Sequence, residues 1–133
     1  MVEIGIQGTA RWDTARAYVD SGASVSIFSA EVADRLGVRL KDGKLSTLTI
    51  GDGGSMEIHV HRLNVQLGPY RLLANIGFSE QLGIGFNLLG REDFFKRFDV
   101  TFSDSKQHLT FQPVEEKKSA GGKGFLTVVR RRR

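Results

Sequence analysis

One carboxylate stands at the end of an apolar segment, in a position from which it could do chemistry. Residues 17–19 read Ala-Tyr-Val, and Asp20, Ser21 and Gly22 follow directly. Asp, Ser and Gly are common turn residues because they satisfy local backbone hydrogen bonds or adopt unusual backbone angles. The triplet alone therefore predicts a strand that ends in a turn. A strand that delivers its carboxylate to a reaction site is the sharper alternative.

Two further segments favour the sharper alternative. Residues 86–91 read Phe-Asn-Leu-Leu-Gly-Arg and lead into a predicted short helix, and residues 50–55 form a glycine-rich hairpin tip between the two. The order is an Asp-Ser-Gly strand, a helix, a glycine-tipped hairpin, an apolar pair with Gly-Arg, a second helix and final strands. This order resembles the retroviral-type aspartic proteases, the retropepsins, and especially their cellular and microbial relatives. The resemblance covers roughly residues 2–112.

The resemblance implies an aspartic endopeptidase that acts without a metal or cofactor. Its fold would be mainly β, a closed barrel with a glycine-tipped flap hairpin and one or two short helices. Peptide hydrolysis needs a base for the water and an acid for the carbonyl, and two carboxyls about 3 Å apart share one proton and supply both. This chain has a single Asp-Ser-Gly motif, so the second carboxylate would come from a second copy of the chain in a homodimer.

The resemblance also assigns residues to roles. Asp20 would be the catalytic carboxylate, the Ser21 hydroxyl would brace the pair of carboxylates across the dimer axis, and Gly22 would let the backbone pass close to a polypeptide substrate. The hairpin near residues 48–57 would close over bound peptide. The candidate substrate-binding residues are Ala23, Ile50, Gly51, Asp52, Gly53, Gly54, Ile84, Phe86 and Leu88.

One position departs from the retroviral pattern. There, a carboxylate four residues after the catalytic Asp pairs with the arginine of the second glycine motif. Here the arginine is Arg91, but the other position holds Ser24. Arg91 therefore needs a different partner: Glu92, Asp93 or a residue across the dimer interface.

Short strands must position these residues. Alternating apolar residues predict strands over residues 2–6, 15–19, 45–50, 56–67, 70–78, 98–102 and 108–111. Ser29 is a predicted N-cap for a helix that runs to Leu36 and stops at Gly37. Residues 91–97 predict a second short helix. The pattern indicates a mainly antiparallel β fold, with a Phe-rich core from Phe94, Phe95, Phe98 and Phe102.

Composition separates a body from a tail. The chain has 133 residues and a net charge of +4, but residues 115–133 carry +5 and residues 1–114 carry −1. We expect a protease domain over residues 1–112 and a flexible basic tail over residues 113–133. The tail could bind nucleic acid or an anionic surface, although a solubilising end is the simpler reading; its apolar residues 125–129 could also fill a cleft or add a strand. With no cysteine, signal-like segment or membrane span, a cytoplasmic location is expected.

Other candidates carry less weight. His59 and His61 lie on one face of a predicted strand, but no third metal ligand is near in sequence, so a solvated face is favoured. Trp12 is expected to be a packed aromatic, and no Ser-His-Asp arrangement supports serine chemistry. The rival function is a catalytically silent dimeric module that binds or regulates peptides on the same fold.

Overall fold

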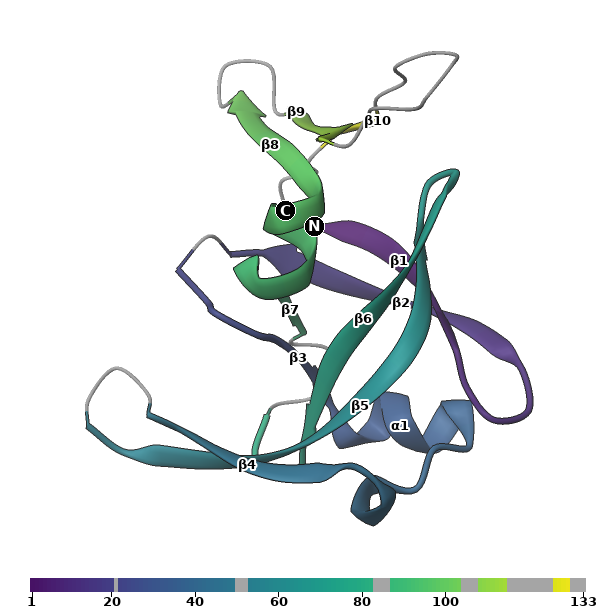
Figure 1. The fold of residues 1–133 in the computed structure, drawn as a ribbon, viewed down its shortest axis with the longest axis vertical. Helices are drawn as coiled ribbons and strands as arrows, with labels where there is room; N and C mark the ends of the chain where they lie inside the picture. The colour runs from purple at the N-terminus through teal and green to yellow at the C-terminus, as the bar shows by residue number, and fades with distance from the viewer. Residues whose placement is uncertain (21, 50–52, 83–86, 104–107, 115–125, 130–133) are drawn as a thin grey trace.

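The computed structural model describes residues 1–20, 22–49, 53–82, 87–103, 108–114 and 126–129, with ten strands and three short helical segments (Figure 1). The strands are β1 (Val2–Gln7), β2 (Trp12–Val19), β3 (Ser26–Ser29), β4 (Lys44–Thr49), β5 (Ser55–Leu67), β6 (Tyr70–Ser79), β7 (Leu88–Leu89), β8 (Phe98–Ser103), β9 (His108–Pro113) and β10 (Leu126–Val129). The helical segments are α1 (Ala30–Leu36), η1 (Leu40–Asp42) and η2 (Arg91–Phe95).

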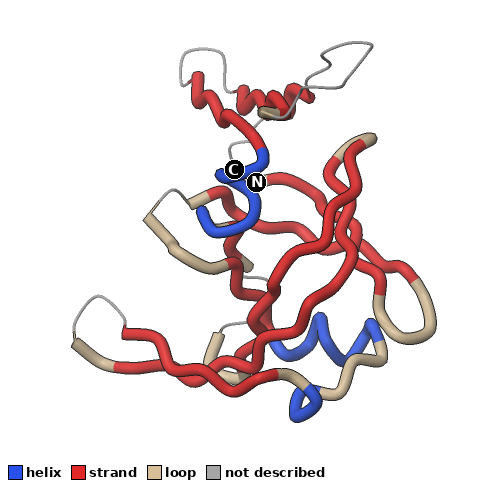
Figure 2. The backbone as a smooth tube through the Cα atoms, viewed as in Figure 1, coloured by secondary structure: helices blue, strands red, loops and turns tan. Residues whose placement is uncertain are grey.

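Seven strands form one curved sheet that closes on itself. Their order is β1-β2-β7-β3-β6-β5-β4, and β1 also pairs with β5 through Gly5–Gln66 and Ile6–Val65. This extra pairing joins the two sides of the sheet into a barrel and leaves β4 outside the closure. Strands dominate the tube view, with α1 against one end of the barrel (Figure 2). The predicted mainly β fold is confirmed.

Alternating side chains fill the barrel. Val2, Ile4 and Ile6 of β1 are at most 2% exposed, while Glu3 and Gln7 between and after them face solvent. On β2, Ala15 and Ala17 are buried in the same core cluster. Such alternation is expected because successive side chains of a strand point to opposite faces of the sheet. The predicted strands at the N-terminus are therefore confirmed.

The sheet is mixed, which the mainly antiparallel pattern did not predict. β2 runs parallel to β7, and β3 runs parallel to β6. The sequence pattern also missed β3, whose four residues are all buried and include Ser26 and Ser29. A strand buried on both faces shows no alternation, so its period cannot reveal it.

Helix α1 has the predicted limits but not the predicted cap. Gly37 ends the helix with φ of 73°, in the left-handed region that glycine adopts without a steric penalty. Ser29 occupies the N-cap position, yet its hydroxyl makes no capping bond, and its buried oxygen has no hydrogen-bond partner among the described residues. The expectation of a serine cap was right in position and wrong in chemistry, because Ser29 is also the last residue of β3 and pairs with Ser79 of β6.

A second sheet lies at the opposite end of the molecule from α1 (Figure 1). It has the order β10-β9-β8, so residues expected in the tail supply a strand that pairs with β9. Phe94 and Phe98 are buried as predicted, but Phe102 of β8 is 44% exposed. The prediction that Phe102 belongs to the core is wrong because it lies near the far end of the hairpin. No helix in the described ranges is long and apolar enough to cross a membrane.

Candidate functional site

Asp20 lies directly after β2, where that strand runs beside β7. Its backbone N–H donates to the carbonyl of Leu89 at 3.0 Å, and two residues earlier Tyr18 donates to the carbonyl of Asn87 at 2.8 Å. These bonds continue the parallel pairing of Val19 with Leu89. Asp20 is thus fixed by the barrel itself and not by a free loop.

The Asp20 carboxylate is half-buried and held by its own turn. Its Oδ1 accepts a hydrogen bond from the Gly22 N–H at 2.9 Å. A Cβ on Gly22 would lie 3.3 Å from the same oxygen, closer than most real contacts of that kind. Glycine therefore allows the close approach that orients the carboxylate.

The segment that follows Asp20 is hydrogen-bonded to the first residues of η2. The Arg91 N–H donates to the Ala23 carbonyl at 2.9 Å, and the Glu92 N–H donates to the Ser24 carbonyl at 2.8 Å. Ala23 also donates to the Asp20 carbonyl at 3.1 Å. Together with the Leu89 bond, these contacts hold the turn between two chain segments that are distant in sequence.

Gly90 makes this close packing possible. A Cβ at Gly90 would lie 2.5 Å from the Val25 carbonyl oxygen and 2.9 Å from the Ala23 carbonyl oxygen, both of them backbone atoms. Its N–H donates to the buried Ser26 hydroxyl at 2.9 Å. Gly90 and Arg91, the pair that stands out in the sequence, therefore pack directly against the turn that follows Asp20.

Asn87 is a structural residue of the site that the sequence analysis did not assign. Its side chain is 3% exposed, its Oδ1 accepts from the Ser29 N–H at 2.9 Å, and its Nδ2 donates to the Arg16 carbonyl at 2.8 Å. It thereby joins β2 to the end of β3. The signal available in the sequence was one amide side chain within the apolar run of residues 86–89.

Some of the other predicted site residues lie in the described part of the chain and the rest lie outside it. Ala23 is half-buried beside the Asp20 turn, and half-buried Leu88 pairs with both Tyr18 and Ile27. Gly53 and Gly54 are exposed just before β5, and Gly53 has φ of 94°. The remaining predicted residues lie outside the described part of the chain: Ser21, Ile50, Gly51, Asp52, Ile84 and Phe86.

Neither neighbouring carboxylate is ion-paired with Arg91. The Asp93 Oδ2 accepts from the backbone N–H of Asn75 at 2.8 Å, which ties η2 to β6. Glu92 is exposed, and Arg91 itself is exposed with no ion pair among the described residues. Glu92 and Asp93, two of the three predicted partners of Arg91, are not paired with it. The third, a residue of a second copy of the chain, stays a prediction.

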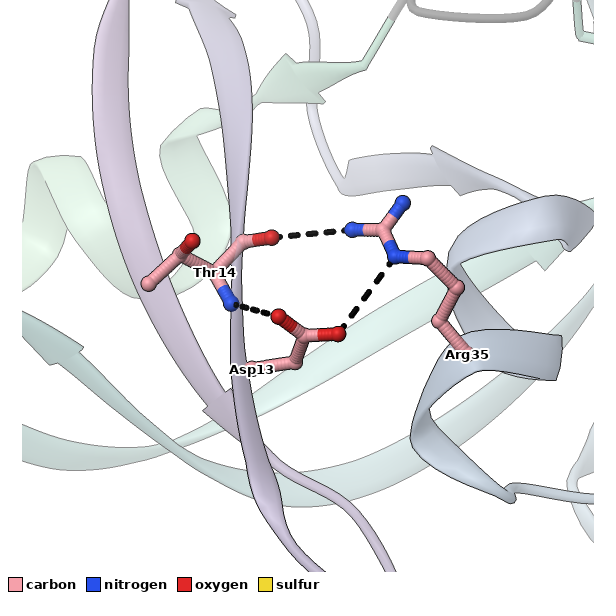
Figure 3. A network of polar contacts seen from close by, with 3 residues as sticks. All are labelled: Asp13, Thr14 and Arg35. Atoms are coloured by element: carbon pink, nitrogen blue, oxygen red, sulfur yellow. Dashed lines mark hydrogen bonds and ion pairs between the residues drawn. The ribbon is translucent and has the colours of Figure 1, made fainter.

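An ion pair anchors α1 at the far end of β2. Arg35 Nε lies 3.4 Å from Asp13 Oδ2, and Arg35 also donates to the Thr14 carbonyl at 2.9 Å (Figure 3). The Thr14 N–H donates to Asp13 Oδ1 at 2.8 Å. This backbone hydrogen bond, followed by the nearby guanidinium of Arg35, lowers the pKa of Asp13 from its ordinary value of 3.8.

Two open cavities of about 470 and 450 Å³ flank α1, and Asp20 lines neither of them. Within the described ranges, no three metal-binding side chains come together.

His61 is half-buried, with its Nε2 3.1 Å from the Leu40 carbonyl oxygen and its ring edge against Phe78. The expectation of a solvated face at His59 and His61 is therefore too simple for His61. Trp12, half-buried, packs beneath the Arg71 guanidinium at 4.9 Å.

The chain is similar to known proteins in both sequence and fold. A family model described as aspartyl protease matches residues 2–76. The chain is 32% identical to DNA damage-inducible protein 1 of Chaetomium globosum over 75% of this chain and 22% of that protein, and 29% identical to the Phaeosphaeria nodorum protein of the same name over 75% and 23%. It therefore spans less than a quarter of these curated relatives.

A solved structure has the same fold. The retroviral protease-like domain of Ddi1 from Leishmania major superposes with a TM-score of 0.55, covering 95% of this chain and 94% of that domain at 20% identity. At this identity the match speaks for the fold alone. It extends over β8 and β9, beyond the residues that the family model matches.

Proposed function

Because the chain belongs to the aspartyl protease family, in its retropepsin-like cellular branch, we propose that it is an aspartic endopeptidase that acts as a homodimer. The observation that carries the proposal is the anchoring of Asp20, whose backbone is held by Leu89 and whose Oδ1 is held by Gly22. A carboxylate so fixed is oriented before a substrate arrives, and such preorganisation is what catalysis requires. We assign the catalytic unit to residues 1–112.

The chemistry needs two Asp20 carboxylates. One, ionised, removes a proton from a water molecule, while the other, protonated, donates a hydrogen bond to the scissile carbonyl of the peptide. The water oxygen attacks the carbonyl carbon, and the proton then passes to the leaving nitrogen as the C–N bond breaks. Each carboxyl is thereby returned to its starting protonation state, so the pair is ready for a further cycle.

A second copy of the chain is proposed to supply the second carboxylate. The sequence holds a single Asp-Ser-Gly motif, so a pair of Asp20 carboxylates needs two copies of the chain. Phe102 and Val114, each 44% exposed on or beside the β8–β9 hairpin, supply apolar surface for a self-complementary interface. Ser21 is proposed to brace the two carboxylates at the two-fold axis.

Substrate contacts are proposed around the same cleft. Ala23 and Leu88 are half-buried next to the Asp20 turn, and we assign them to its walls. The β4–β5 hairpin is proposed to act as a flap over the bound peptide, with glycines at its tip. The assignments at Ile50, Gly51, Asp52, Ile84 and Phe86 rest on the sequence.

Asp20→Asn tests the chemistry. The amide keeps an oxygen that can accept from the Gly22 N–H, so we expect the fold and the dimer to persist while cleavage of a peptide library is lost. Asp34→Asn on exposed α1 is the matched control and should keep full activity. A wild-type protein that cleaves no peptide between about pH 3 and 8 would favour the silent peptide-binding module. Cleavage that a statine-type inhibitor fails to block would instead contradict the two-carboxylate chemistry.

Mixing tests the dimer separately. When wild-type and Asp20→Asn chains are refolded together in equal amounts, random pairing leaves ~25% of the dimers with two carboxylates. We expect activity to fall to about that fraction at fixed total concentration. A value near one half would mean that each chain works alone.

A further inference from the structure

The β4–β5 hairpin is joined to the barrel through only a few contacts at its base. The β5–β6 ladder runs from Leu67–Tyr70 and ends at His59–Phe78. Next along β5, Ile58 is 1% exposed and packs so tightly on Gly77 that a Cβ there would lie 2.8 Å from Ile58 Cδ1. Beyond Ile58 the strand ladder of β5 continues with β4 alone among the described residues, and the two strands extend away from the barrel (Figure 1).

Gln81 adds one hydrogen bond past the end of that ladder. Its Oε1 accepts from the Glu57 N–H at 3.0 Å, in the place where a further residue of β6 would otherwise bind. The Gln81 N–H in turn donates at 2.9 Å to the hydroxyl of Ser79, which is 1% exposed. Gln81, whose side chain binds the hairpin, is therefore itself hydrogen-bonded through its backbone to a buried residue of the barrel.

Resting on the proposed function, we infer that Gln81 is a positioning residue that sets the angle of the β4–β5 hairpin over the substrate. A two-stranded hairpin has little stability of its own in water, so its orientation depends on the anchors at its base. Of these, Ile58 is an apolar contact that allows rotation, whereas the Gln81 bond is directional.

The position of Gln81 in the chain links the hairpin to the catalytic turn. Gln81 is the second residue of the connection from β6 to β7, and β7 contains Leu89, whose carbonyl accepts from Asp20. The Gln81 side chain thus binds the base of the hairpin, and Leu89, eight residues later in the chain, binds the Asp20 backbone.

Two substitutions isolate the acceptor. Gln81→Met keeps the length of the side chain and removes the oxygen, while Gln81→Glu keeps an oxygen at the same place. Gln66→Met is the matched control, because Gln66 Oε1 accepts from Arg71 Nε at 2.8 Å at the other end of β5. Gln81 is exposed and Gln66 is half-buried on β5, and circular dichroism checks that all three variants fold.

Nuclear magnetic resonance of the full chain gives a readout that does not need activity. In Gln81→Met we expect the Glu57 amide to exchange about 3–10-fold faster, the factor expected from one lost hydrogen bond. Backbone order parameters should fall across β4 and the start of β5 together. Gln81→Glu should restore both, and Gln66→Met should change neither. A change confined to Glu57 would overturn the positioning role, since it would mean that the bond is merely local.

Peptide cleavage gives the functional readout. A hairpin held at the wrong angle loses contacts made equally to bound peptide and transition state, so Gln81→Met should raise KM about 3–10-fold with kcat within about twofold. Unchanged KM alongside a mobile hairpin would refute the inference while leaving the protease intact. A wild type that cleaves nothing refutes the protease and, with it, the role over substrate; the resonance data then still decide whether Gln81 orients the hairpin.

Discussion

Gly90→Ala is the sharpest test of how the Asp20 turn is held. The added methyl would lie 2.5 Å from the Val25 carbonyl oxygen, 2.6 Å from the Val25 carbonyl carbon and 2.9 Å from the Ala23 carbonyl oxygen. All three are backbone atoms, so no side-chain rotation relieves the contact. Gly90 has φ of −106°, which alanine adopts freely, so the effect comes from packing and not from backbone angles.

The expected magnitude follows from the contact. Overpacking a well-packed site costs about 1–3 kcal/mol, and relief by moving the turn would lengthen the Arg91–Ala23 hydrogen bond of 2.9 Å. For a chain of this size, each kcal/mol corresponds to roughly 4 °C in Tm. We therefore expect a Tm lower by about 4–12 °C and, since the Asp20 turn shifts, a loss of cleavage of more than about 10-fold.

Gly5→Ala is the control. Gly5 lies in β1, and a Cβ there would meet Gln66 and Trp12 only at 3.7 Å, an ordinary contact distance. This change should be neutral or stabilising by about 0.4–1 kcal/mol, because alanine restricts the unfolded chain. Urea unfolding at one fixed protein concentration measures both variants. If Gly90→Ala unfolds within about 0.5 kcal/mol of Gly5→Ala, the proposed packing of the turn is wrong.

Two further changes probe the supports of the site. Asn87→Leu leaves the two backbone groups that its amide serves without partners, so the free energy of unfolding should drop by about 2–4 kcal/mol; a drop below about 0.5 kcal/mol by urea titration would count against the role of Asn87. The folded-state pKa of Asp13 lies below 3.8, so its ionised form stabilises the fold above that pH and the stabilisation fades as the pH falls through the folded pKa. Asp13→Asn should therefore be less stable than wild type at neutral pH, with the gap closing in acid, and a gap that is constant with pH would contradict this.

The strands of the barrel could be predicted wherever one face is buried. Val2, Ile4 and Ile6 alternate with exposed residues, and the sequence carries that alternation directly. The limits of α1 were also predictable, because Gly37 provides a positive φ at its end. Local patterns thus recovered the elements whose causes are local.

The polar supports of the site could not be predicted in the same way. Ser26 is 2% exposed because its hydroxyl accepts from Gly90, 64 residues away. Asn87 is buried for a similar reason, since both of its partners are contributed by other strands. Residues whose partners are distant in sequence carry no periodic signal, so only the assembled barrel explains them.

At the Asp20 turn, the order of the segments was predictable but the contacts of Arg91 were not. Asp-Ser-Gly and the later Gly-Arg could be matched in the sequence, and the structure brings them together through the Arg91–Ala23 bond. Asp93, one of the considered partners of Arg91, instead binds the Asn75 N–H. Which acid binds which base depends on side-chain placement, and a motif does not specify that.

The hydrogen-bond partners around the Asp20 turn lie far apart in the sequence, and this has a consequence for the timing of synthesis. The side-chain hydrogen bonds that unite the site join residues 58, 64 and 71 positions apart. A ribosome that adds about 5–20 residues per second needs roughly 4–14 s to cover the longest of these intervals. Throughout that period the nascent chain has Asp20 but not the segment that fixes it, so the Asp20 turn is held in a growing polypeptide only after the residues up to Glu92 have been made.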